Sequence, residues 1–80
     1  MFSKDYPNLD WWVSSHGYIE IGESSYYSNA WVTLLDEGGT CCEIEDATSF
    51  DDALRKADRW ASVEIEERFG EEPPKRYDDI

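Results

Sequence analysis

The chain has 80 residues, of which 40% are hydrophobic and 15% aromatic, and its formal net charge at pH 7 is -12. A chain of this length forms at most one small domain, in which a deep substrate cavity would be hard to build. The negative charge disfavours direct binding to nucleic acid or to an anionic membrane and favours a basic protein partner. The apolar and aromatic content is too high for a disordered chain, so we expect a folded globule.

The basic residues are unevenly distributed along the chain. Between Asp5 and Leu54 there is no Lys or Arg, whereas the same stretch contains eleven acidic residues. This stretch therefore has no bases of its own with which to neutralise its surface. No apolar run approaches the ~20 residues of a membrane span, and the N-terminus lacks the order of a signal peptide, so we expect a cytoplasmic protein.

The first expected element is a short helix over residues 9–16. Asn8 is a suitable N-cap, Asp10 is an acid in the first turn, and Gly17 is placed to end the helix in a left-handed cap.

Three strands are expected next, over residues 18–21, residues 30–36 and the segment after Gly38-Gly39, with a polar loop at 23–29. A three-residue turn at 37–39 would set Asp36 opposite Thr40. The resulting buried face would contain Ile19, Ile21, Val32, Leu34, Cys42 and Ile44. A two-residue turn would instead bring the Glu43 carboxylate into this core row at a large desolvation cost, so the three-residue turn is favoured.

The clearest element is a second helix, which begins after Ser49 as N-cap and ends at Gly70. Apolar residues recur at steps of three and four, at Phe50, Ala53, Leu54, Ala57, Ala61, Ile65 and Phe69. Three acid-first pairs lie four residues apart, namely Asp51 with Arg55, Asp52 with Lys56 and Glu64 with Arg68. Residues 1–70 are thus expected to form one domain, and the proline-containing residues 71–80 an exposed or loosely docked tail.

The expected order is helix, three antiparallel strands, helix, which is an α+β fold. Both helices should lie on one face of the sheet because only one face is uniformly apolar. Double-stranded RNA-binding domains share this order, but their electrostatics are the reverse.

The residue types needed for catalysis or metal binding are not suitably arranged. His16 is the only histidine, and the consecutive Ser14, Ser15 and His16 cannot form a nucleophile, base and orienting group. Cys41 and Cys42 are adjacent, so on a regular strand they point to opposite faces and do not converge on zinc. We therefore expect reduced thiols, no enzymatic activity, no cofactor and no metal.

The expected partner-binding surface is the face of the sheet that the helices leave uncovered. Aromatic and aliphatic side chains ringed by uncompensated carboxylates are typical of a protein-binding surface. The residues expected to bind a partner are Tyr18, Glu20, Tyr26, Tyr27, Trp31, Leu35, Asp36, Glu37, Glu43 and Glu45. The alternative is a solvated acidic face, in which Trp31 packs on Tyr18 or turns inward.

Two resemblances add to this interpretation. The segment HGYIEIGESSYYSNAWVTLLDEGG and the capped helix beyond it resemble short uncharacterised acidic proteins of cyanobacterial type, over roughly residues 11–60. That resemblance implies no activity. The layout and charge are also similar to those of phage anti-CRISPR proteins that imitate DNA, a likeness that carries no functional residue across.

The leading hypothesis is a small non-enzymatic binding or inhibitor protein, a monomer or homodimer, that docks its acidic sheet face on a basic protein. The partner could be a nucleic-acid-binding protein, with the carboxylates acting as a DNA mimic. The alternative is an accessory subunit or adaptor of a cytoplasmic bacterial assembly that binds through a mainly hydrophobic surface.

Overall fold

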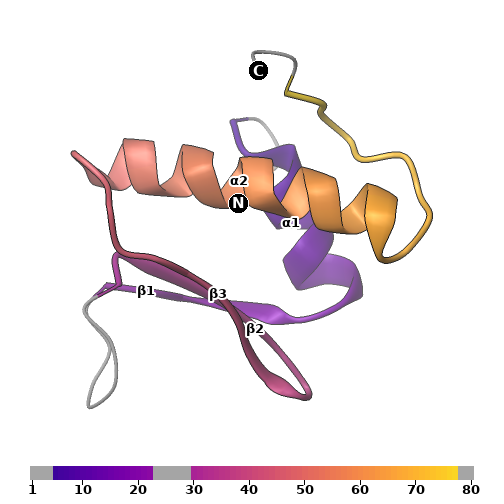
Figure 1. The fold of residues 1–80 in the computed structure, drawn as a ribbon, viewed down its shortest axis with the longest axis horizontal. Helices are drawn as coiled ribbons and strands as arrows, with labels where there is room; N and C mark the ends of the chain where they lie inside the picture. The colour runs from indigo at the N-terminus through magenta and orange to yellow at the C-terminus, as the bar shows by residue number, and fades with distance from the viewer. Residues whose placement is uncertain (1–4, 23–29, 78–80) are drawn as a thin grey trace.

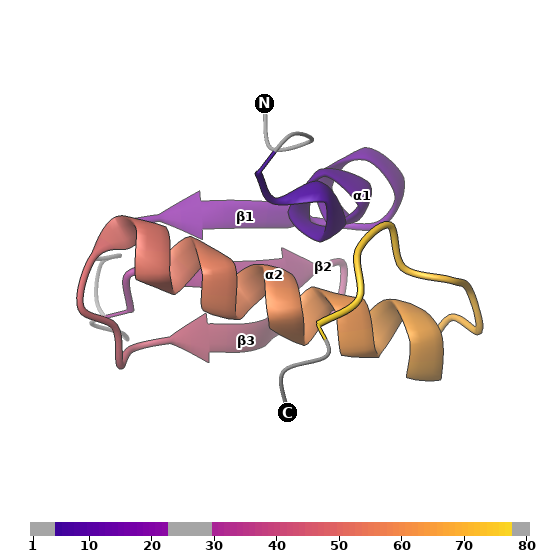
Figure 2. The ribbon, with the colours of Figure 1, turned by 90° about the horizontal axis from the view of Figure 1, so that it is seen from above.

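The protein folds into two layers, a sheet and a pair of helices (Figure 1). The computed structural model describes residues 5–22 and 30–77. Its elements are α1 (Pro7–Ser15), β1 (Tyr18–Ile21), β2 (Val32–Asp36), β3 (Gly39–Ile44) and α2 (Phe50–Glu67). The strands form one antiparallel sheet in the order β1-β2-β3, and both helices lie on the same side of it (Figure 2). The α+β fold expected from the sequence is confirmed.

The α1 helix begins at Pro7 instead of Leu9, and the expected cap is wrong. Tyr6 is the N-cap and makes no side-chain capping bond, while Pro7 occupies the first turn, where its missing N–H costs nothing. Asn8 is completely buried and uses its side chain elsewhere.

Gly17 does not adopt the expected left-handed conformation, since it is not among the glycines with positive φ. A glycine is needed there because a Cβ would lie 2.0 Å from the carbonyl oxygen of Leu35. The indole Nε1 of Trp12 donates to the same oxygen at 3.1 Å. The close approach of Gly17 therefore fixes the end of α1 against β2.

The β2–β3 hairpin has the expected core register but a different turn. Val32 pairs with Ile44 and Leu34 with Cys42, as predicted. Asp36, however, pairs with Gly39 and not with Thr40, so the loop has two residues instead of three. A bulge next to Leu34 restores the register, because it inserts one extra residue into β3.

The extra residue is Cys41, and the bulge corrects a second expectation. Both Cys41 and Cys42 pack against the core, whereas regular alternation would have placed Cys41 on the uncovered face. Two residues of a bulged strand oppose a single residue of the partner strand, so the alternation of side chains is interrupted there.

The core lies between the sheet and the two helices. Its fully buried apolar residues are Leu9, Trp12, Ala30, Val32, Leu34, Ala53, Ala57, Ala61 and Ile65. Ile21 belongs to the same face by register but is 55% exposed, because it lies at the far end of an edge strand from α1 (Figure 2). Most of the α2 residues in this core are alanines, namely Ala53, Ala57 and Ala61.

The start of α2 follows the sequence prediction, whereas the helix ends at Glu67, a few residues before the expected Gly70. The Ser49 hydroxyl accepts the backbone N–H of Asp52 at 3.1 Å, and the Asp52 carboxylate accepts the N–H of Thr48 at 3.1 Å. Beyond the helix, Gly70 has φ +68°, a left-handed conformation that directs the chain away from the helix axis.

The segment after α2 turns back along the helices and makes specific contacts (Figures 1 and 2). The Asn8 side chain donates to the Lys75 carbonyl at 2.9 Å and accepts the Lys75 N–H at 3.1 Å. The Tyr77 hydroxyl donates to the buried Asp58 carboxylate at 2.6 Å, and Pro73 is buried. These contacts give residues 71–77 a defined path that the sequence alone did not indicate.

Candidate functional site

The uncovered side of the sheet carries two cross-strand rows of side chains. Tyr18 of β1, Leu35 of β2 and Thr40 of β3 are directly opposite one another, and so are Glu20, Thr33 and Glu43. We call the surface formed by these six residues the open sheet face. It exists because polar residues alternate along each strand with residues that face the helices.

Most of the open sheet face is accessible to a partner. Glu20, Thr40 and Glu43 are exposed, Tyr18 is 53% exposed, and Leu35 is half-buried. The central Thr33 is different, since only 4% of it is exposed. The face therefore combines acidic and aromatic side chains around a threonine that is almost fully buried.

The positive charges lie in the helix layer. Ion pairs join Arg55 to Asp51 at 2.7 Å, Lys56 to Asp52 at 3.4 Å, Arg68 to Glu64 at 3.6 Å and Arg76 to Glu66 at 2.6 Å. The three pairs predicted within α2 are thus confirmed. By contrast, no basic side chain in residues 5–22 or 30–77 forms an ion pair with Glu20 or Glu43.

The Thr33 hydroxyl has no hydrogen-bond partner within the part of the chain that the structure describes. Native structures satisfy the large majority of buried polar side-chain atoms, so an unpaired buried hydroxyl calls for an explanation. This one lies in a row between two carboxylate-bearing residues.

Not all predicted binding residues lie on this face. Tyr18, Glu20, Leu35 and Glu43 do. Glu37 is exposed in the β2–β3 turn, and Glu45 is exposed just after β3, where a hollow of about 350 Å³ is lined by Glu43, Ile44, Glu45, Asp46 and Lys56. Tyr26 and Tyr27 lie outside the described residues.

The structure places Trp31 and Asp36, both predicted to bind a partner, away from the open sheet face. The Trp31 ring packs edge-on against Phe50 of α2, with centroids 4.9 Å apart, and contacts the core. The tryptophan therefore turns inward, as the alternative interpretation allowed, because α2 begins directly over this end of the sheet. Asp36 is 8% exposed and faces the helix layer, on the same side of β2 as Leu34.

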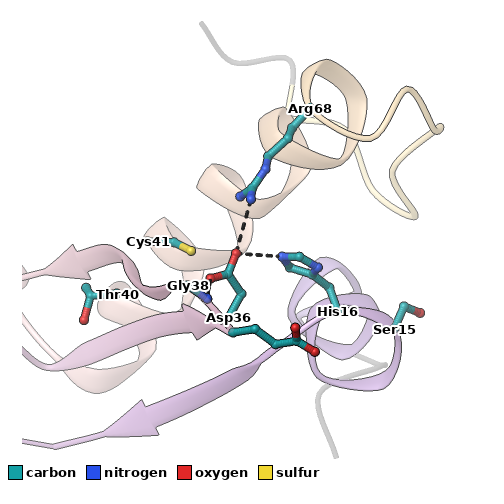
Figure 3. Close-up of a pocket in the computed structure, with 8 residues that line it drawn as sticks. Ser15, His16, Asp36, Gly38, Thr40, Cys41 and Arg68 are labelled. Carbon is teal, nitrogen blue, oxygen red and sulfur yellow. Dashed lines mark hydrogen bonds and ion pairs between the residues drawn. The ribbon is translucent and has the colours of Figure 1, made fainter.

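Asp36 joins three elements at the hairpin end of the molecule (Figure 3). Its Oδ2 lies 3.1 Å from Nε2 of His16, which ends α1, and 3.2 Å from Nη2 of Arg68, which ends α2. Its Oδ1 accepts the backbone N–H of Gly38 at 2.8 Å. The bond from Gly38 and those from the Cys41, His16 and Arg68 side chains hold the pKa of Asp36 below its usual value, although burial opposes the shift.

A cavity of about 680 Å³ adjoins this cluster, lined by Ser15, His16, Asp36, Glu37, Gly38, Thr40, Cys41 and Arg68. Burial and the neighbouring Asp36 carboxylate raise the pKa of the Cys41 thiol, so it is a poor nucleophile. Burial also raises the pKa of Cys42, to about 11. The cavity therefore combines a histidine and a cysteine without an activated thiolate.

The imidazole of His16 is occupied by structural contacts. It packs edge-on against Trp12 and Phe69, with centroids 4.6 Å away in each case. Together with its bond to Asp36, these contacts fix the ring at the junction of α1 and α2. The His16, Asp36 and Arg68 cluster thus supports the fold, and the open sheet face is the better candidate for binding.

Sequence reasoning missed a second buried cluster, formed by Asn8, Asp58 and Tyr77. Asp58 is fully buried and accepts bonds from the Leu9 N–H at 2.9 Å, the Asn8 amide at 3.1 Å and the Tyr77 hydroxyl. The position of Asp58 in the sequence could have indicated its burial. It follows Ala57 and lies about one turn before Ala61, so it is at the edge of the apolar stripe of the helix.

Two other kinds of site find no support in residues 5–22 and 30–77. These residues contain no group of three His, Cys, Asp or Glu side chains that could hold a metal ion, and their two cysteines are free. None of their helices is long and apolar enough to cross a membrane.

Comparisons with protein-family models, with curated proteins and with solved structures found no match for this chain. The resemblances to acidic proteins of cyanobacterial type and to DNA-mimicking anti-CRISPR proteins therefore stay predictions.

Proposed function

We propose that the chain is a small non-enzymatic binding protein that docks its open sheet face on a basic surface of another protein. The observation that carries this proposal is the separation of charge between the two layers. The described bases lie in α2 and in the segment after it, whereas Glu20 and Glu43 lie by register on the opposite side of the sheet. A basic partner would neutralise Glu20 and Glu43, whose carboxylates form no ion pair with the bases of residues 5–22 and 30–77.

The architecture also supports imitation of a nucleic acid. The carboxylates on the two edge strands β1 and β3 are held by a shared hydrogen-bonded sheet, so they bind cations with little loss of backbone entropy. A site that normally contacts phosphates would meet a comparable array of negative charge. The inhibited partner would then be a nucleic-acid-binding protein.

A salt-gradient capture experiment tests the proposal. Immobilised wild-type chain should retain a basic protein from a cell extract and release it at moderate salt, because exposed charge contacts are screened. The variant Glu20→Gln/Glu43→Gln should release the same protein at lower salt. The matched control Glu71→Gln/Glu72→Gln removes the same charge from exposed residues after α2 and should elute like wild type. Identical elution of all three would contradict the proposal.

An adaptor that binds mainly through apolar contacts is the second candidate. The row of Tyr18 and Leu35 favours it, because this row places an exposed aromatic ring beside a half-buried aliphatic side chain. In that case Tyr18→Ala should weaken binding more than Glu20→Gln/Glu43→Gln does, and the complex should persist at high salt.

A further inference from the structure

The row of Glu20, Thr33 and Glu43 has the geometry of a binding site for one cationic group. The three residues are directly opposite one another on β1, β2 and β3. Neighbouring strands lie about 4.8 Å apart, so the Cα atoms of the two glutamates are roughly 10 Å apart across the row. Both glutamates are exposed, and their side chains are long enough to converge above the central strand.

The middle of the row contains the unsatisfied group. The Thr33 Oγ1 is buried and has no partner among the described residues, and the residue is 4% exposed. A hydroxyl can donate one hydrogen bond, which a flanking carboxylate could accept, but its own lone pairs can be filled only by another donor, because an ionised carboxylate has no proton to give. A donor placed between the two glutamates would therefore satisfy the hydroxyl and both charges together.

We propose that this row binds a single arginine side chain presented by the basic partner; the inference rests on the function proposed above. A guanidinium group has five N–H donors arranged around a plane, so it can meet one carboxylate on each edge while a further N–H points to Thr33. A lysine ammonium is compact, and both carboxylates would have to move much closer together to reach it.

The adjacent row supplies contacts that suit the rest of an arginine side chain. Tyr18 precedes Glu20 by two residues on the same face of β1, which places it about 7 Å along the strand. Its exposed ring can stack on the guanidinium plane, and the half-buried Leu35 beside it can contact the aliphatic stem.

Three capped peptides of equal length test the inference, each with four Arg, four Lys or four citrulline residues separated by Gly-Ser. Titrations of the full chain are followed through its backbone amide NMR signals. The Arg peptide should bind about 3- to 10-fold more tightly than the Lys peptide, and the citrulline peptide should not bind measurably. The largest shifts should lie at residues 18–20, 33–35 and 42–43.

The substitution Thr33→Val isolates the role of the hydroxyl. Valine has nearly the same shape and lacks the unpaired hydroxyl, so the variant should be at least as stable as wild type. It should also lose the preference for Arg over Lys, while Thr33→Ser should keep that preference. A less stable Thr33→Val, or an undiminished Arg preference, would show that the hydroxyl does not serve the cation.

The outcomes separate this inference from the proposed function. Equal binding of the Arg and Lys peptides would contradict the proposed arginine-binding site. The proposed function would still stand if Glu20→Gln/Glu43→Gln weakens capture of the natural partner. Retention of that partner by the double variant at wild-type salt overturns both. The control Glu71→Gln/Glu72→Gln should leave the peptide preference unchanged.

Discussion

The Asp36 carboxylate and the His16 imidazole lie 3.1 Å apart and join the end of β2 to the residue that ends α1. Arg68, at the end of α2, approaches the same Oδ2 at 3.2 Å. One carboxylate thus connects the sheet to both helices. The structure thus places Asp36, one of the acids that the sequence predicted to bind a partner, buried in a cluster between the sheet and the helices.

The Asp36 cluster predicts a pH dependence of stability. The Gly38 N–H and the neighbouring side chains lower the pKa of Asp36 in the folded protein. The stabilisation is therefore present above the unfolded pKa of about 3.9 and is lost as the pH falls through the folded pKa. Asp36→Asn should unfold at lower urea concentration at pH 7, and its midpoint should change less than that of wild type between pH 5 and the most acidic pH reached.

Glu37→Gln is the matched control for Asp36, since it removes a neighbouring exposed carboxylate of the same turn. Its urea midpoint should vary with pH as that of wild type does. If the midpoints of Asp36→Asn and wild type instead vary with pH in parallel, the Asp36 carboxylate makes no net contribution to stability.

Gly17→Ala should destabilise the protein although alanine favours helices. The added Cβ would lie 2.0 Å from the Leu35 carbonyl oxygen, so the chain must move and the Trp12 bond to that oxygen must lengthen. The expected loss is about 1–3 kcal/mol in the free energy of unfolding, a typical cost of overpacking. Ser14→Ala, on the exposed side of α1, is the control for urea denaturation and should behave like wild type within about 0.5 kcal/mol.

Tyr77→Phe should loosen the segment after α2. The substitution removes the 2.6 Å bond to the buried Asp58 carboxylate and should cost about 1–2 kcal/mol in the free energy of unfolding. Hydrogen exchange at the Lys75 amide should accelerate, because that N–H bonds to Asn8 in the same cluster. Tyr18→Phe, at an exposed tyrosine, should change neither quantity; equal effects of the two substitutions would argue against the docked path of residues 71–77.

Trp31 and Tyr18 should respond differently to truncation. Trp31→Ala removes the ring that packs on Phe50 and should lower the free energy of unfolding by about 1–3 kcal/mol. It should not change affinity for the partner once the variant is measured in its folded state. Tyr18→Ala should weaken binding of the partner and leave the free energy of unfolding nearly unchanged, because the Tyr18 ring is exposed on the open sheet face. Loss of affinity in folded Trp31→Ala would restore Trp31 to the binding surface.

Local patterns predicted the elements that depend on local interactions. The period of α2, its Ser49 cap and Gly70 after its end are properties of neighbouring residues, and the structure confirms them. The core register was also predictable, because a shift of one residue would bury Glu43 among apolar side chains.

The details that depend on residues far apart in the chain were not predictable. A two-residue turn followed by a bulge at Cys41 gives the same core register as a three-residue turn, so the hydrophobic pattern could not distinguish them. Asparagine is a common residue at helix N-caps, yet the Asn8 side chain donates a hydrogen bond to Asp58, 50 residues away in the chain. The surroundings of Asp36 likewise follow from where α1 and α2 end in space.

The most direct test of the central claim is the salt dependence of affinity for the captured partner. Dissociation constants should be measured by biolayer interferometry from low to high salt for wild type, Glu20→Gln/Glu43→Gln and Glu71→Gln/Glu72→Gln. We predict weaker binding and a shallower dependence on salt for the open-face variant alone, since only it loses charges that contact the partner in the proposed complex. The same constants and the same slope for all three proteins would contradict binding through the open sheet face.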